Sequence, residues 1–232
     1  MPPDKDPATA AAEAAAKELV RTAYGDLLQP AARVVGAELG DFVSAIVVAG
    51  RGFGYLIREK YAPFVQRAIS RVPEQRRMLP APEILGPILE GVTYLREGTE
   101  LSDMFEALLS CAADSDRSGD SHPSFPGMLQ RLSPDEARLL KAVSEVKVAA
   151  YYNTILPNGA KSLNRISGHG NIFEHPNNQI FYMSNLFAIG VLATGRGEPS
   201  GEKDASGVEG WKFEVTLSET GIRFMAACST GN

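Results

Sequence analysis

The 232-residue sequence contains few of the residues that build metal and thiol chemistry: only two cysteines and three histidines. Cys111 and Cys228 share no metal-type spacing, and each lies in an apolar helical pattern. We therefore expect two buried, reduced thiols and a cytoplasmic address. His169 and His175 have no cysteine or carboxylate cluster beside them at ligand spacing, and the sequence predicts neither a metal centre nor a cofactor.

Positive charge is also scarce. Lysine and arginine number 23 against 28 acidic residues, a net charge of −5, which argues against a general electrostatic grip on nucleic acid or anionic lipid. Basic residues gather between Arg51 and Arg77, where we expect a solvated surface. Long apolar runs are missing too, because the longest, residues 42–57, contains Arg51 and three glycines and is too short to span a bilayer. The alanine-rich start does not resemble a secretory signal.

Motifs that carry catalysis are missing as well. The sequence contains no G-x-S-x-G, P-loop or H-E-x-x-H pattern. An apolar run at residues 45–49 followed by Gly50, Gly52 and Gly54 imitates a dinucleotide-binding turn, but Tyr55 stands where the third glycine would be needed. A corner between two helices explains these glycines as well, and we expect a protein without an enzymatic reaction.

The clearest pattern runs from residue 82 to residue 137, where apolar residues recur at helical spacing. One predicted helical face consists of Ile84, Leu85, Ile88, Leu89, Val92 and Leu95, and the next of Leu101, Met104, Phe105, Leu108, Leu109 and Ala112. Glu106 is expected on the solvent side of the second helix. Ser133, Pro134 and Glu136 form a capping box with proline at the first helical position, which predicts a third helix.

The flanking regions complete the predicted architecture. Residues 1–8 are expected to be disordered, with helices over 9–28, 30–47 and 55–69. After a strand at 148–155 and a long loop at 161–176, the pattern predicts a helix at 177–189, a β-hairpin around a polar tip at 195–210, and a last helix at 218–228. The residues expected to be buried in these later helices are Leu139, Leu140, Val143, Val146, Ile180, Phe181, Met183, Leu186, Phe187, Ile189, Ile222, Phe224, Met225 and Ala227.

The predicted fold class is therefore mainly α. We expect an N-terminal helical bundle in residues 1–132, followed in residues 133–232 by a winged-helix-like α+β module with a β-hairpin wing. The order of helix, helix, hairpin and helix in the second part is typical of winged-helix proteins.

The candidate site residues are Asp114, His122, Pro123, Ser124 and Phe125. His122 faces several aspartates in the sequence and can act as an acid, a base or a ligand. A structural role is favoured, because a histidine before a proline-initiated helix can cap it while Phe125 fills the core behind.

The motifs also resemble a known family, the prokaryotic abortive-infection alpha family. The matching stretches are residues 86–90, 100–114, 122–125, 132–137, 185–192 and 217–225. The resemblance implies a role in phage defence, and implies no catalytic residues. We expect the protein to contact a protein partner from host or phage. A winged-helix DNA-binding regulator and a membrane-active effector using residues 42–57 are the alternatives, although helix 177–189 contains no lysine or arginine to read DNA.

Overall fold

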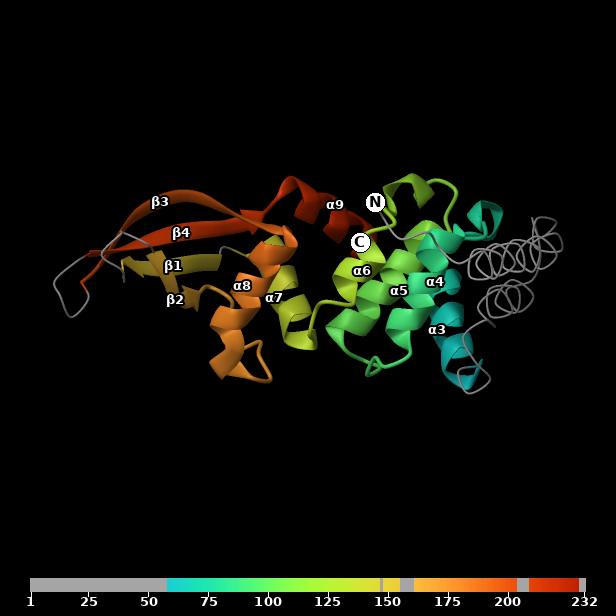
Figure 1. Cartoon of the computed structure of the whole chain (residues 1–232). Helices are drawn as coiled ribbons and strands as arrows, with labels where there is room; N and C mark the ends of the chain where they lie inside the picture. The colour runs from blue at the N-terminus through green and yellow to red at the C-terminus, as the bar shows by residue number, and fades with distance from the viewer. Residues whose placement is uncertain (1–57, 147, 155–160, 204–208, 230–232) are drawn as a thin grey trace, which may run out of the picture.

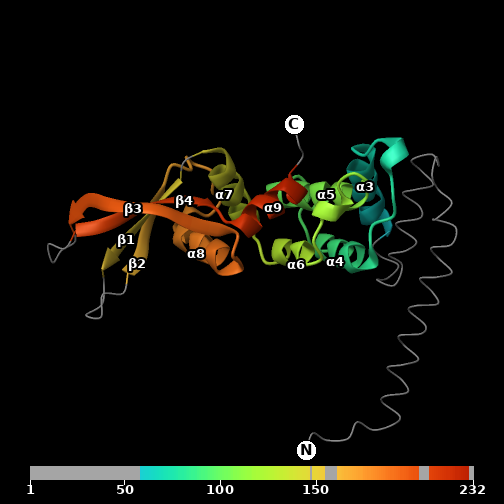
Figure 2. The same cartoon turned by 90° about the horizontal axis from the view of Figure 1, so that it is seen from above.

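The computed structural model describes residues 58–146, 148–154, 161–203 and 209–229. Helices gather at one end of an elongated molecule and a twisted sheet extends from the other (Figure 1), and the view from above shows the same division (Figure 2). The predictions made for residues 1–8, for the helices at 9–28 and 30–47 and for the apolar run 42–57 lie outside the described residues.

The helical end is built around α5, which contacts α3, α4, α6, α7 and α9. Its helices are α3 (Arg58–Ser70), α4 (Pro82–Val92), α5 (Glu100–Ala112) and α6 (Phe125–Leu129), with short 3₁₀ turns η3 (Glu74–Arg76) and η4 (Ser118–Asp120) between them. Both predicted faces of the central block are confirmed. Every residue expected on them is buried except Leu95, which is partly buried against the same core.

Glu106 is the exception to the predicted solvent face of α5. Its exposed fraction is 2%, so the expectation of a surface position is wrong. The reason is that α3 covers this side of α5 and brings Arg67 and Arg71 to the carboxylate at 2.6 and 2.9 Å. A charged residue is tolerated there because two partners satisfy it.

The α+β end begins with α7 (Pro134–Glu145), which starts at the predicted capping box. Its antiparallel sheet has the order β2-β1-β4-β3. The strands are β1 (Val148–Thr154), β2 (Lys161–Ser167), β3 (Leu192–Lys203) and β4 (Glu209–Leu217), and the helices that complete this end are α8 (Gln179–Ile189), which follows η5 (Pro176–Asn178), and α9 (Glu219–Cys228). The chain is mainly helical with an α+β module, as the sequence predicts.

Strand β2 corrects the predicted long loop at 161–176. It pairs with β1 from Ala149↔Ser167 to Thr154↔Lys161, with a register shift between Tyr151 and Tyr152. An edge strand with polar residues and an irregular register carries little apolar alternation, so its residues show no period from which a strand could be predicted. The pairing of β3 with β4 confirms the predicted hairpin, but the predicted tip at 195–210 is too long, because residues 195–203 belong to β3 and residues 209–210 belong to β4.

Three apolar side chains expected in the core are exposed: Phe181 by 67%, Ile222 by 54% and Val146 by 49%. Val146 is the residue that ends α7, where the chain turns into the sheet. Phe181 lies outside the face of α8 that is buried, which comprises Tyr182, Met183 and Leu186. Helical spacing groups residues on faces, but it does not say how wide the buried face is.

A close backbone contact positions α9 between the two ends. Gly190 ends α8 with φ of 86°, the left-handed conformation that glycine adopts without strain. Ser218 caps α9 by accepting the Gly221 N–H at 2.9 Å and donates to the Gly190 carbonyl at 2.6 Å. A Cβ on Gly221 would lie 2.0 Å from the Val191 carbonyl oxygen. Only glycine lets α9 start this close to the end of α8.

Candidate functional site

Asp114, the first of the predicted site residues, is a buried structural carboxylate at the end of α5. It pairs with Arg76 of η3 at 3.0 Å and accepts the Asp116 N–H at 3.0 Å. Residues 77 and 114 also form an isolated antiparallel bridge. Asp114 therefore fastens the connector between α3 and α4 to the end of α5.

His122, Pro123, Ser124 and Phe125 form the turn that starts α6. His122 is exposed, and its Nδ1 accepts the Ser124 N–H at 3.1 Å. This bond holds the turn before α6 and does not cap the helix, because α6 begins at Phe125 and has no side-chain cap hydrogen bond. The side chain of Phe125 is buried and meets Phe224 of α9 edge-on, with ring centroids 5.3 Å apart. Phe125 therefore fills the core as expected. Within the described residues, no ion pair or hydrogen bond joins His122 to an aspartate.

A cleft of about 460 Å³ lies beside this turn. It lies between the loop that carries Asp120 and His122 and the face of α9 that carries Thr220 and Arg223. The structure thus brings three predicted site residues, His122, Ser124 and Phe125, to one cleft and leaves Asp114 and Pro123 outside its lining. Arg223 was not singled out, because no sequence signal relates it to the His122 turn.

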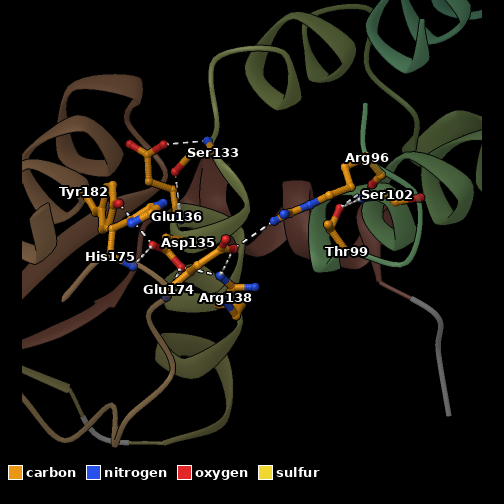
Figure 3. Close-up of polar contacts among 10 residues, drawn as sticks. All are labelled: Arg96, Thr99, Ser102, Ser133, Asp135, Glu136, Arg138, Glu174, His175 and Tyr182. Atoms are coloured by element: carbon orange, nitrogen blue, oxygen red, sulfur yellow. Dashed lines mark hydrogen bonds and ion pairs between the residues drawn. The ribbon is translucent and has the colours of Figure 1, made fainter. Parts of the chain in front are cut away.

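The most connected polar cluster surrounds Asp135 and Glu136, the first-turn carboxylates of α7 (Figure 3). Glu136 completes the capping box, accepting the Ser133 N–H at 2.6 Å while its own N–H bonds the Ser133 hydroxyl at 3.3 Å. Its other oxygen accepts a hydrogen bond from the Asn185 amide of α8 at 2.6 Å. One carboxylate thus caps α7 and holds α8.

Asp135 is 3% exposed and makes the larger set of contacts. It accepts the N–H groups of Glu174 and His175 at 2.8 and 2.9 Å, the Tyr182 hydroxyl at 3.1 Å, and a hydrogen bond from Arg138. Burial by itself raises the pKa of Asp135, but these donors outweigh it and bring the pKa to about 2. Asp135 stays ionised, and it holds both the loop before α8 and α8 itself against the start of α7. Sequence reasoning missed this role, because nothing in the capping pattern distinguishes Asp135 from an exposed first-turn acid.

Ion pairs extend this cluster to the helical end. Glu174 lies 2.8 Å from Arg96, in the loop before α5, and 3.7 Å from Arg138 (Figure 3). The hydrogen bond from Arg96 holds the pKa of Glu174 below its usual value. Lys141 of α7 meets Glu100 of α5 at 3.0 Å. Both links cross from one end of the molecule to the other on exposed side chains, so each contributes little by itself.

Among the large apolar side chains on the described helices, the most exposed belongs to α8. It contains no charged residue, and Phe181 is 67% exposed while Tyr182, Met183 and Leu186 are buried. An exposed helix normally carries charged residues on its outer face, so an apolar outer face is typical of a contact surface. We refer below to the exposed residues Phe181, Ser184 and Ala188 as the α8 stripe.

The described residues hold no group of three or more His, Cys, Asp or Glu side chains placed to bind a metal ion. In that same part of the chain, no helix combines the length and apolarity needed to cross a membrane. Both cysteines are free and buried, and burial raises the pKa of each thiol. Thiols of this kind are poor nucleophiles and behave as small apolar side chains.

These features define a class of protein in which a helical bundle is joined to an α+β module and buried carboxylates link neighbouring elements through ion pairs and hydrogen bonds. The chain belongs to the abortive infection alpha family, whose sequence model matches residues 56–228. This confirms the resemblance carried by the motifs and links the protein to phage defence. No curated protein and no solved structure matches the chain significantly.

Proposed function

We propose that this protein acts in abortive infection by contacting another protein through the α8 stripe, in the cytoplasm and without a reaction of its own. The observation that carries the proposal is the exposure of Phe181, 67%, on a helix with no charged residue. Phenylalanine offers about 150–250 Å² for burial. Covering its exposed part at roughly 25 cal/mol per Å² contributes about 3 kcal/mol, the size of an interface hot spot.

The proposal includes the winged-helix-like arrangement, in which α7, α8, the β3–β4 hairpin and α9 follow in order and α8 takes the place of the recognition helix. DNA is the weaker partner for this helix, because it has no lysine or arginine to contact phosphates or guanine. In the hairpin, Lys212 lies 3.4 Å from Glu198, so its charge is already partly neutralised. An uncharged apolar stripe suits a protein surface better than a polyanion.

A phage-protection assay tests this proposal. Cells expressing Phe181→Glu at the parental level should lose protection, because a carboxylate on the α8 stripe would have to be buried in the contact. Ile222→Glu is the matched control, since Ile222 is 54% exposed and lies on α9. Full protection by Phe181→Glu, with the fold verified by an unchanged melting temperature, would contradict the proposal.

A further inference from the structure

The cleft beside the His122 turn is walled by two parts of the chain that are distant in sequence. One wall carries Asp120 and His122, and the other is the face of α9 that carries Thr220 and Arg223. Two of the stretches that carry the family resemblance, residues 122–125 and 217–225, therefore meet at this cleft. Neither wall takes part in the proposed contact through α8.

The two walls are fixed to each other. The Arg117 guanidinium, just before η4, donates to the Ala226 carbonyl of α9 at 2.8 Å. Phe125 meets Phe224 of α9 edge-on, with ring centroids 5.3 Å apart, and both rings are buried. The cleft is thus formed before any ligand arrives, and a ligand that enters it does not have to order its walls.

Opposite charges line the cleft without neutralising each other. Asp120 lies on η4 and Arg223 lies on α9, and both side chains are exposed. Neither side chain forms a hydrogen bond or an ion pair with any other residue in the described part of the chain. A simple anion would be repelled by Asp120, and a simple cation by Arg223. A molecule that carries both charges is attracted by both walls.

The rest of the lining suits the body of such a molecule. Phe125 and Ala226 add apolar surface, and Ser124 and Thr220 add hydroxyl groups. The volume of about 460 Å³ lies within the range of small-molecule sites and equals that of about 15 water molecules. The ends of an extended dipeptide lie about 7 Å apart, so its two charges reach groups that do not touch each other.

The geometry points to a binding site for a dipeptide-sized zwitterion in this cleft. The carboxylate of the ligand pairs with Arg223, where a guanidinium offers two parallel N–H donors. Its ammonium group pairs with Asp120 on the opposite wall. This site is separate from the α8 stripe and does not depend on the contact proposed for it.

An NMR titration of the full chain with glycyl-leucine tests the site. The amide signals of Gly119, Ser124 and Thr220 should shift saturably, with a dissociation constant of about 1 mM or lower. N-acetyl-glycyl-leucine lacks the ammonium group and glycyl-leucinamide lacks the carboxylate, so each should bind at least about tenfold more weakly. The absence of a saturable shift up to about 10 mM glycyl-leucine would overturn the inference.

Substitutions assign each charge to its wall. Arg223→Gln should weaken glycyl-leucine at least about tenfold but should not weaken glycyl-leucinamide, which has no carboxylate to lose a partner. Asp120→Asn should likewise weaken glycyl-leucine and spare the N-acetylated form. Arg131→Gln is the control, because Arg131 is exposed and lies outside the lining. Unchanged binding by Arg223→Gln, or equal weakening of all three probes at an unchanged melting temperature, would overturn the assignment.

Discussion

Replacing Asp135 by asparagine tests the fastening role of the buried carboxylate. The pKa of Asp135 falls from 3.8 to about 2 in the folded protein. At about 1.4 kcal/mol for each pKa unit, the charge contributes about 2.5 kcal/mol to the free energy of unfolding at neutral pH. Asparagine keeps the size and one acceptor, but it removes the nearer of the two carboxylates beside Arg138, and its amide group places N–H donors against other donors. We expect Asp135→Asn to lower the free energy of unfolding by about 2–3 kcal/mol at pH 7.

The pH dependence follows from the direction of the shift. A depressed folded-state pKa means that the contribution of Asp135 is complete above the unfolded pKa of 3.8 and is lost as the pH falls through the folded pKa of about 2. Urea unfolding of parent and variant at several values between pH 7 and pH 2.5 should therefore give free-energy curves that converge on acidification. The convergence isolates the charge from any difference in packing.

Asp103→Asn provides the control, because Asp103 is exposed on α5 and forms no ion pair with any other described residue. It should change the free energy of unfolding by less than about 0.5 kcal/mol at every pH. If Asp135→Asn lowered the free energy of unfolding by the same amount at pH 2.5 as at pH 7, or by no more than the control does, the charge of Asp135 would not stabilise the fold.

Three further substitutions follow from the structure. Glu106→Gln should lower the free energy of unfolding by about 1–3 kcal/mol in urea, because it removes the charge that pairs with two arginines. The cost stays moderate because both arginines are partly exposed, and a cost near zero would show that the carboxylate is not buried. Gly221→Ala should cost about 1–3 kcal/mol because its Cβ would collide with the Val191 carbonyl, whereas Gly86→Ala, with open space around it, should be neutral or stabilising. His122→Ala should lower stability by about 1 kcal/mol or less, because it removes the hydrogen bond to the Ser124 N–H in the turn before α6, and it should leave phage protection intact; loss of protection at unchanged melting temperature would assign the cleft a direct role.

The sequence predicts the helices correctly where regular local patterns determine them. The capping box at Ser133 fixed the start of α7, Gly190 marked the end of α8, and the apolar spacing on α4 and α5 identified the core faces. Each of these signals depends on residues within a few positions of one another, so no knowledge of the tertiary fold is needed.

The features that the sequence did not predict share a different cause, because each depends on a contact between segments that are distant in the chain. Glu106 is buried only because α3 brings Arg67 and Arg71 to it from 39 and 35 positions away in the chain. Asp135 gains its role from a loop about 40 residues further on. Phe181 was expected in the core because spacing alone cannot show that α8 is covered on one narrow face. The helical spacing that correctly located α8 thus also placed Phe181 wrongly in the core.

Photo-cross-linking from position 181 in infected cells tests most directly whether α8 contacts another protein. A benzophenone amino acid replaces Phe181 in the full chain, and in the control it replaces Ile222, which is 54% exposed on α9. We expect covalent adducts with protein from position 181 and none from position 222. Adducts with DNA, or no adduct at position 181 in cells that remain protected, would contradict it.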